Sequence, residues 1–321
     1  MPENQPKTSI NSPKSDFRNL IISNPDGTYT RHIQFPSISP NPNSSSSPIL
    51  TKDIPINTSN QTYLRIYLPR HLLTTTTNHR LPLLIYFHGG GFVFSTPSST
   101  INHDFCYLLS QHINAVIVSV RYRLAPEHRL PAAYDDAIEA LQFIKMSDEH
   151  WLTQFTDVSR CFLMGTSAGG NIGFHVVSRS FKLDLEPLKI RGLILHHPFF
   201  GGLERTQSEI KMAFDSILPL AGNDFLWELS LPEGSDRDHE FCNPVTGFDL
   251  EKFEGVRVLV LGCYGDPLFD RHVELVKMFE EKGVKIVKHF GEGLHGWEVN
   301  DLRKAELIFP VLNDFMSSCV I

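Results

Sequence analysis

The sequence predicts an α/β fold in which a mostly parallel sheet carries helices on both faces. Short apolar runs recur along the chain, as expected of strands that are buried on both faces, and helical patterns lie between them. The chain of 321 residues shows no domain boundary, so we expect a single domain over residues 1–321. The apolar runs cover residues 83–87, 115–120, 161–164, 193–195, 256–261 and 284–289.

The first 60 residues are rich in Pro, Ser, Asn and Thr, which favours loops over packed elements. Within them, residues 28–34 fit a short strand and residues 37–48 fit a loop. We expect residues 1–60 to form a mobile segment that becomes ordered as part of a cover over a site.

The next segments alternate between strand and helix patterns. Residues 62–68 alternate in polarity and end at Pro69, which predicts an amphipathic strand, and residues 72–80 read as a surface loop. Pro131 suits the start of a helix. The apolar face of that helix would comprise Ala133, Ala137, Leu141 and Ile144.

Two further helices are predicted towards the C-terminus. Asp270 suits an N-cap and Gly283 a C-cap for the helix between them. Residues 302–316 form the last helical pattern, which Pro310 should bend.

Residues 201–249 interrupt the alternation, because they contain no strand pattern. Residues 210–214 and 223–229 fit short helices inside this insertion. Such a long insertion is typical of a lid rather than of a linker. We therefore predict a small helical cap, with Ile217, Phe225 and Trp227 as exposed apolar side chains.

Composition excludes several classes of function. A net charge of −7 disfavours binding to nucleic acid or to an anionic membrane surface. No apolar stretch reaches the length of a membrane span, and the N-terminus lacks the apolar core of a secretory signal. The five cysteines form no CxxC pair, which indicates reduced thiols in a cytoplasmic protein without a zinc site. We expect no metal and no cofactor, and nothing in the sequence indicates the oligomeric state.

A glycine-flanked serine is the strongest candidate for chemistry. Residues 165–169 read Gly-Thr-Ser-Ala-Gly, after an apolar run and before a segment of small and apolar residues. This pattern predicts a strand, a sharp turn and a helix, with Ser167 at the tip of the turn. The pentapeptide alone is weak, because it often occurs by chance, so the rest of the chain must supply a base and an acid.

The chain supplies both in the order that this pattern requires, first an acid and then a histidine. Asp266 follows the strand predicted at residues 256–261, and His295 follows the last predicted strand, in a loop with glycines on both sides. Parallel strands bring such loops to one edge of the sheet. Asp270 is a competing acid, but it suits a helix cap better, so we assign the acid to Asp266.

A glycine run completes the candidate site formed by Ser167, Asp266 and His295. It reads His-Gly-Gly-Gly-Phe at residues 88–92 and directly follows a predicted strand. Its backbone N–H groups, at Gly89, Gly90 and Gly91, together with that of Ala168, could stabilise an oxyanion. A phosphate loop is the alternative, but the run lacks the Lys-Ser/Thr ending of that motif.

Candidates for a substrate pocket flank these motifs, although each is about as easily explained as ordinary core. His196 and His197 form a pair at a strand end without a partner at metal-ligand spacing, which favours a core or pocket-rim position. The candidates are Phe92, Phe94, Tyr122, His196, Phe199, Phe200, Leu268 and Trp297.

Taken with residues 119–128 and 130–136, these motifs resemble the hormone-sensitive-lipase-like branch of the α/β-hydrolases, and most closely the plant carboxylesterases. The resemblance covers most of the chain. It implies an α/β-hydrolase fold, a triad of Ser167, Asp266 and His295, an oxyanion hole at residues 88–91 with Ala168, and a cap made of the N-terminus and residues 201–249.

The sequence departs from the family pattern at two positions. Thr166 stands where the family usually has an acidic residue, and Arg121 stands where it usually has Asp. Both positions are expected near the site.

The resemblance implies a serine carboxylesterase that hydrolyses a small ester, such as an acetyl ester of a plant specialised metabolite. The first alternative is a dehydratase, a lactone-forming transferase or a cyclase that uses the same site without net hydrolysis. The second is a ligand receptor. The gibberellin receptors look like this family but lack the catalytic histidine, so the presence of His295 disfavours a receptor.

Overall fold

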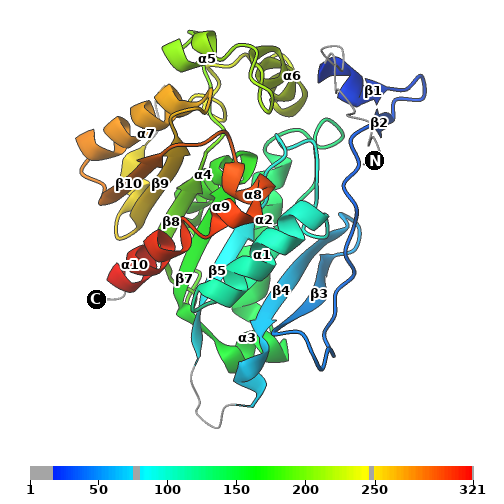
Figure 1. Cartoon of the computed structure of the whole chain (residues 1–321), viewed down its shortest axis with the longest axis vertical. Helices are drawn as coiled ribbons and strands as arrows, with labels where there is room; N and C mark the ends of the chain where they lie inside the picture. Colours follow the sequence, from blue (N-terminus) through cyan, green and yellow to red (C-terminus); the bar gives the residue numbers. More distant parts are fainter. Residues whose placement is uncertain (1–16, 75–79, 246–248, 320–321) are drawn as a thin grey trace, which may run out of the picture.

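A twisted sheet of eight strands forms the centre of the protein, in a computed structural model that describes residues 17–74, 80–245 and 249–319 (Figure 1). The strand order is β10-β9-β8-β7-β5-β6-β4-β3. The six strands β5 to β10 are parallel, and β4 runs antiparallel to both β6 and β3. The strands are β3 (Ile49–Asn57), β4 (Thr62–Pro69), β5 (Leu81–Phe87), β6 (Val116–Arg121), β7 (Thr156–Thr166), β8 (Ile190–His196), β9 (Arg257–Cys263) and β10 (Ile286–Gly291).

Alternation along the central strands sends side chains to two separate cores. In β5, Leu83, Ile85 and Phe87 enter the larger core, whereas Leu84 and Tyr86 enter the smaller one. The larger core is closed by α2 (Ala132–Met146), α4 (Ala168–Ser180) and α7 (Phe269–Glu281). The smaller core is closed by α1 (Thr100–His112) and α10 (Phe309–Ser318). The predicted fold class, with helices on both faces of a mostly parallel sheet, is therefore confirmed.

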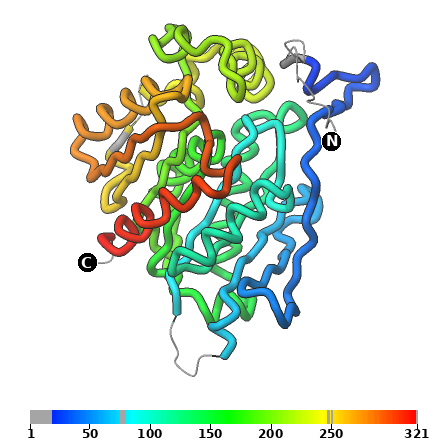
Figure 2. Tube along the Cα trace, viewed as in Figure 1, coloured from blue at the N-terminus to red at the C-terminus, as the bar shows by residue number. Residues whose placement is uncertain are grey.

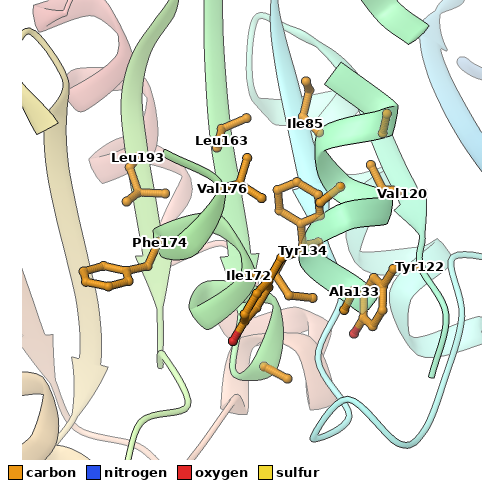
Figure 3. Packing of buried hydrophobic residues seen from close by; sticks show 14 of the residues in the cluster. Ile85, Val120, Tyr122, Ala133, Tyr134, Leu163, Ile172, Phe174, Val176 and Leu193 are labelled. Carbon is orange, nitrogen blue, oxygen red and sulfur yellow. The ribbon is translucent and has the colours of Figure 1, made fainter. Parts of the chain in front are cut away.

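The larger core shows how an apolar helix face meets the sheet. Val176 of α4 lies beside Leu163 of β7, and Ile172 of α4 and Leu193 of β8 belong to the same cluster (Figure 3). All four side chains are fully buried. This packing fixes α4, and with it the turn between β7 and α4.

One strand of the large sheet, β3, was not predicted, because polar residues interrupt its apolar pattern. β3 contains Lys52 and Asp53 and lies within the segment expected to be mobile, yet it pairs with β4 along its length. It is the edge strand, so its polar side chains reach the surface, and Asp53 forms an ion pair at 2.7 Å with the buried Arg65 of β4. The last part of residues 1–60 is thus part of the sheet.

Two helix ends differ from the prediction. α7 begins at Phe269, so Asp270 lies in its first turn and not at the N-cap, which is Leu268. The predicted helix over residues 302–316 is broken rather than bent. It consists of α9 (Leu302–Ala305) and α10, with Pro310 in the first turn of α10, where a proline needs no N–H partner.

The cap and the N-terminal segment lie at the same end of the molecule (Figure 2). The cap contains α5 (Gln207–Lys211) and α6 (Leu220–Ser230), and the N-terminal segment contains a small hairpin of β1 (Ile21–Ser23) and β2 (Tyr29–Arg31). The remaining elements are η1 (Phe17–Leu20), η2 (Arg70–Leu73), α3 (His150–Phe155), η3 (Leu250–Phe253) and α8 (Trp297–Asn300).

Most of the loop predicted at residues 72–80 lies outside the described residues. Within the described part of the chain, no helix combines the length and the apolar character that crossing a membrane requires.

Candidate active site

The glycine-flanked serine lies in a sharp turn between β7 and α4. Ser167 has φ 55° and ψ −119°, a conformation that costs energy in any residue with a side chain. A Cβ atom on Gly169 would lie 1.9 Å from the carbonyl oxygen of Phe87, and one on Gly165 would lie 2.0 Å from the carbonyl oxygen of Gly169. Both positions therefore require glycine, because the backbones of turn, helix and strand are in direct contact.

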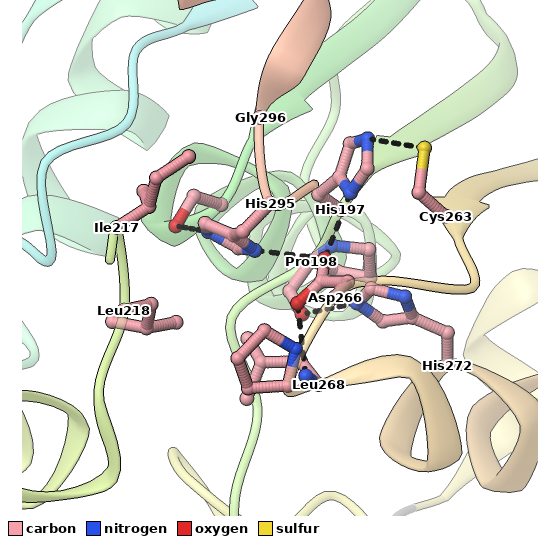
Figure 4. Close-up of polar contacts among 12 residues, drawn as sticks. His197, Pro198, Ile217, Leu218, Cys263, Asp266, Leu268, His272, His295 and Gly296 are labelled. Atoms are coloured by element: carbon pink, nitrogen blue, oxygen red, sulfur yellow. Dashed lines mark hydrogen bonds and ion pairs between the residues drawn. The ribbon is translucent and has the colours of Figure 1, made fainter. Parts of the chain in front are cut away.

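Ser167, His295 and Asp266 meet at this edge of the sheet although they are far apart in sequence. The Ser167 Oγ lies 2.9 Å from His295 Nε2, and His295 Nδ1 lies 2.8 Å from Asp266 Oδ2 (Figure 4). Asp266 is fully buried, and its Oδ1 accepts the Leu268 N–H at 2.8 Å. The geometry is that of a serine–histidine–carboxylate relay.

The charge of Asp266 is stabilised by its neighbours. Burial alone would raise the pKa of this carboxyl, but His295 and His197 hold it well below its usual range. The carboxylate is therefore ionised and can accept from His295 Nδ1.

The competing acid, Asp270, has a different partner. Its Oδ2 accepts the N–H of Ser208 at 2.7 Å and so ties the first turn of α7 to α5 of the cap. Asp266, not Asp270, is the carboxylate that contacts His295.

The glycine run packs against the serine turn. A Cβ atom on Gly89 would lie 3.1 Å from the Thr166 carbonyl oxygen and 3.4 Å from the Ser167 Cβ. Gly90 and Gly91 have φ angles of 110° and 60°, which turn the chain sharply past the serine. Within the described part of the chain, no carbonyl accepts a hydrogen bond from the N–H of Gly89, Gly90 or Ala168.

His88 and Tyr122 support this run from behind. The rings stack with centroids 4.3 Å apart, and the Tyr122 hydroxyl donates to the His88 carbonyl oxygen at 2.8 Å. Burial lowers the pKa of His88 to about 4, so the ring is neutral. Tyr122 therefore contacts the glycine loop from the core side.

Thr166 is part of a buried chain of hydrogen bonds. Its Oγ1 accepts from the Tyr86 hydroxyl at 2.9 Å and lies 2.8 Å from His196 Nδ1. His196 Nε2 in turn lies 3.2 Å from Glu298 Oε2. Hydrogen bonds thus connect the Thr166 hydroxyl to the Glu298 carboxylate through the His196 ring.

Arg121, the other departure from the family pattern, lies further from the serine than expected. It ends β6, and its Nε donates to the Gln61 carbonyl oxygen at 3.1 Å. It is not among the described residues that line the cavity beside Ser167.

A cavity of about 220 Å³ opens in front of Ser167 and His295. Its base is formed by the strand-end loops that carry these residues, the glycine run and Phe199, and we call this base the catalytic floor (residues 88–91, 165–169, 197–199, 263–268 and 291–296). Its cover, which we call the roof, consists of residues 17–35 and 201–245. The roof contributes Ile33, Phe35, Ile217, Leu218 and Leu226 to the lining.

Phe94 and Phe199 also line this cavity, in contrast to the other six pocket candidates. Phe92 and Phe200 pack in the larger core, Tyr122 and His196 have the contacts given above, and Leu268 is buried beside Asp266. Trp297 lies under the Lys304 ammonium, 4.4 Å from the ring centroid. Proximity to a motif in the sequence was therefore a poor guide to which aromatic residues line the cavity.

The cap also buries one side chain that we expected to be exposed. Trp227 is fully buried and stacks on Phe199, with centroids 4.6 Å apart and an interplanar angle of 5°. Ile217 and Phe225 are half-buried. The cap is thus packed onto the floor through an aromatic pair.

The N-terminal segment is anchored by one arginine. Arg31 Nε donates to the Val93 carbonyl oxygen at 2.7 Å, and Nη2 donates to that of Ala125 at 2.8 Å. The same guanidinium forms an ion pair with Glu127 at 2.5 Å. This holds Ile33 and Phe35 over the cavity, a role that no sequence motif indicated.

Two groups of side chains hold nitrogen and oxygen atoms within 4.8 Å of one another, namely His196, His197 and Glu298, and His197, Asp266 and His295. In both groups these atoms already form hydrogen bonds with each other. Hydrogen bonds among these side chains therefore account for their arrangement. Glu298 was not predicted, because a glutamate three residues after a histidine is a common pattern.

Comparison with known proteins agrees with this geometry. The pattern of a family described as "alpha/beta hydrolase fold" matches residues 84–299. Carboxylesterase 20 of Arabidopsis thaliana is 44% identical over 310 residues, which are 93% of this chain and 95% of that protein. The 3-O-acetylpapaveroxine carboxylesterase CXE2 of Papaver somniferum is 46% identical over 315 residues, or 94% of this chain and 98% of that protein.

The same comparisons include a receptor and a solved enzyme. Gibberellin receptor GID1B of Arabidopsis thaliana is 38% identical over 69% of this chain and 65% of the receptor. The solved Pyrobaculum calidifontis esterase superimposes with a TM-score of 0.71 at 25% identity, over 84% of this chain and 86% of the esterase. The chain therefore belongs to the plant carboxylesterases, carboxylic ester hydrolases of the hormone-sensitive-lipase-like branch of the α/β-hydrolase superfamily.

Proposed function

We propose that the protein is a serine carboxylesterase that hydrolyses a small carboxylic ester through an acyl-enzyme. One observation carries the proposal, the continuous relay from Ser167 Oγ through His295 to the ionised Asp266, with separations of 2.9 and 2.8 Å. A serine hydroxyl becomes nucleophilic when a positioned base removes its proton.

Each residue has a defined step. Ser167 Oγ attacks the ester carbonyl while His295 Nε2 takes its proton, and the N–H groups of Gly89, Gly90 and Ala168 stabilise the oxyanion. His295 then protonates the leaving alcohol, and the acyl group stays on Ser167. Water that gives a proton to His295 attacks the acyl-enzyme, and His295 passes this proton to Ser167 Oγ as the acid leaves. Asp266 holds the imidazole and stabilises its cation throughout.

We propose that the substrate is an acetyl ester of a plant specialised metabolite. The cavity of about 220 Å³ is smaller than the roughly 300–1,000 Å³ of sites for drug-sized ligands. Its roof is apolar, which suits a neutral ester, and a relative that is 46% identical is named for a 3-O-acetyl substrate. We place the enzyme in the cytoplasm, because its five cysteines are free thiols.

The relay argues against a receptor, which needs no serine within 2.9 Å of an imidazole. A dehydratase or cyclase would use the same site, so the fate of water distinguishes it from an esterase. Thr166 leaves the relay intact, because its hydroxyl is bonded to Tyr86 and His196 and points away from His295.

The test compares Ser167→Ala with Ser178→Ala, a serine on the same helix α4 that has no contact with His295. Turnover of p-nitrophenyl acetate should vanish in the first variant and persist in the second. Incorporation of heavy oxygen from labelled water into the released acid separates hydrolysis from elimination or cyclisation. Hydrolysis by Ser167→Ala at the native rate, or product without label, would contradict the proposal.

A further inference from the structure

A second histidine contacts the catalytic carboxylate from the side opposite to the cavity. His197 is fully buried, with its Nδ1 2.8 Å from Asp266 Oδ2 and its Nε2 3.0 Å from Glu298 Oε2 (Figure 4). An ionised carboxylate can only accept hydrogen bonds, so each ring nitrogen must carry a proton. Two carboxylates at the two nitrogens require an imidazolium.

The neighbours of Glu298 favour its ionised form. It faces His196 Nε2 at 3.2 Å, His197 Nε2 at 3.0 Å and the Cys263 thiol at 3.9 Å, all of which can donate. The His196 tautomer with its proton on Nε2 fits these contacts, since Nδ1 can then accept from the Thr166 hydroxyl, which itself accepts from Tyr86. Burial acts to raise the pKa of Glu298, but His196 and His197 hold it far below its usual range.

Among the described residues, two further imidazoles beside the His197 ring are neutral and do not supply this charge. His272 lies 6.1 Å away between ring centroids and is neutral, since burial lowers its pKa to about 3. The ring of His196 lies 4.7 Å away, and burial lowers its pKa as well. For His197 itself, burial lowers the pKa, but the bonds to Asp266, Cys263 and Glu298 raise it well above its ordinary value.

The effect reaches the triad because one oxygen is shared. Asp266 Oδ2 lies 2.8 Å from His197 Nδ1 and also 2.8 Å from His295 Nδ1. The rings of His197 and His295 are 5.7 Å apart between centroids. A positive charge at this distance disfavours a second proton on His295, which must be unprotonated to act as a base.

We propose that His197, an imidazolium held between Asp266 and Glu298, is a positioning residue that fixes the catalytic carboxylate and offsets part of its charge. His295 thereby stays free of a proton at a lower pH than it would beside an uncompensated Asp266. The kinetic part of this proposal rests on the proposed esterase function, whereas the charge on His197 does not.

The first experiment measures that charge without any turnover. The full-length wild-type protein is labelled with nitrogen-15 histidine, and its ring signals are recorded at about pH 8, where an ordinary histidine is neutral. One histidine should still show protons on both ring nitrogens, and this signal should disappear in His197→Gln. Absence of any doubly protonated ring at this pH would overturn the proposal.

The second experiment measures the pH dependence of kcat/KM for an acetyl ester. In His197→Gln, which retains a donor but no charge, the midpoint of the acidic limb should rise by roughly one pH unit. His272→Gln is the matched control, because this buried histidine is neutral and bonds to the Pro198 carbonyl oxygen. Its midpoint should match the wild type. A lower rate in His197→Gln with an unmoved midpoint would show a packing role only and would overturn the proposal.

The two experiments also separate this proposal from the function on which it rests. If Ser167→Ala hydrolysed esters at the native rate, the esterase mechanism would fail while the doubly protonated signal of His197 stayed. If the signal were missing while Ser167→Ala was inactive, the esterase mechanism would stand and the imidazolium would be wrong.

Discussion

The catalytic floor and the roof enclose the same cavity, but different interactions hold them in place. In the floor, backbone contacts fix each group, because Gly165 and Gly169 leave no room for a Cβ atom and the strand ends bring Asp266 and His295 to Ser167. In the roof, side chains from two distant segments meet through packing and through the contacts of Arg31. We therefore expect the floor to carry out the chemistry and the roof to determine which substrate shapes fit.

The strongest way to break the floor is Gly169→Ala. The added methyl group would lie 1.9 Å from the Phe87 carbonyl oxygen and 2.8 Å from that of His88, so strand or helix must move. The loss of stability should exceed the roughly 1–3 kcal/mol typical of overpacking, with no measurable esterase activity. Urea denaturation and ester turnover provide the measurements.

Gly173→Ala, one turn further along α4, is the matched control. Its methyl group would meet only the tip of Leu193, at 3.1 Å, and alanine favours a helix interior. Stability and activity should remain near wild type. Equal effects of the two substitutions would show that the close backbone approach at Gly169 is not what fixes the floor.

Next in size is the effect of Asp266→Asn on kcat. An amide preserves the shape but presents its N–H₂ or an uncharged oxygen to two imidazoles, so His295 loses its orientation and its counter-charge. We expect kcat to fall by roughly 10⁴-fold, as in other serine triads. Asp270→Asn should retain most of the activity, because that carboxylate bonds to the Ser208 N–H instead. Comparable losses in both variants would contradict our assignment of the acid.

Two buried histidines, His88 in the floor and His272 in α7 behind it, should make the stability of the protein depend on pH. Burial lowers the pKa of His88 to about 4 and of His272 to about 3, below the ordinary value near 6.5. As the pH falls below about 6.5, the unfolded chain takes up protons that the folded chain does not, so the free energy of unfolding decreases by about 1.4 kcal/mol per pH unit for each such histidine.

His272→Gln tests this sign. Unfolding followed by urea between about pH 6.5 and pH 4.5 should show a slope smaller by about one proton than that of the wild type. A slope that did not change would mean that His272 takes up its proton in the folded protein.

The smallest effect is expected from loosening the roof. Arg31→Ala removes the donors to the Val93 and Ala125 carbonyl oxygens and the ion pair with Glu127. KM should rise roughly tenfold while kcat changes less than twofold, because about 1.4 kcal/mol of ordering is lost from substrate binding and the relay stays intact. The exposed Arg303→Ala is the control. A large fall in kcat for Arg31→Ala would remove the distinction between floor and roof.

The sequence predicted the two regions unequally, for a physical reason. Strand ends, glycine turns and the order of Ser167, Asp266 and His295 are local signals, so the floor could be predicted closely. The lining of the roof depends on which side of a short helix faces inwards, and neither Ile33 nor Leu226 stands in a motif. Polar residues in the edge strand β3 hid that element, and Glu298 has its role only because α8 brings it to the two histidines.

The aromatic pair of cap and floor also provides an optical reporter. The chain has three tryptophans, and Trp227 is the one that stacks on Phe199 at the cavity. Once Trp151 and Trp297 are replaced by phenylalanine, the tryptophan fluorescence comes from Trp227 of the cap alone. Its emission would shift to longer wavelength whenever the indole meets water, so opening of the cavity could be timed in a stopped-flow instrument without any label.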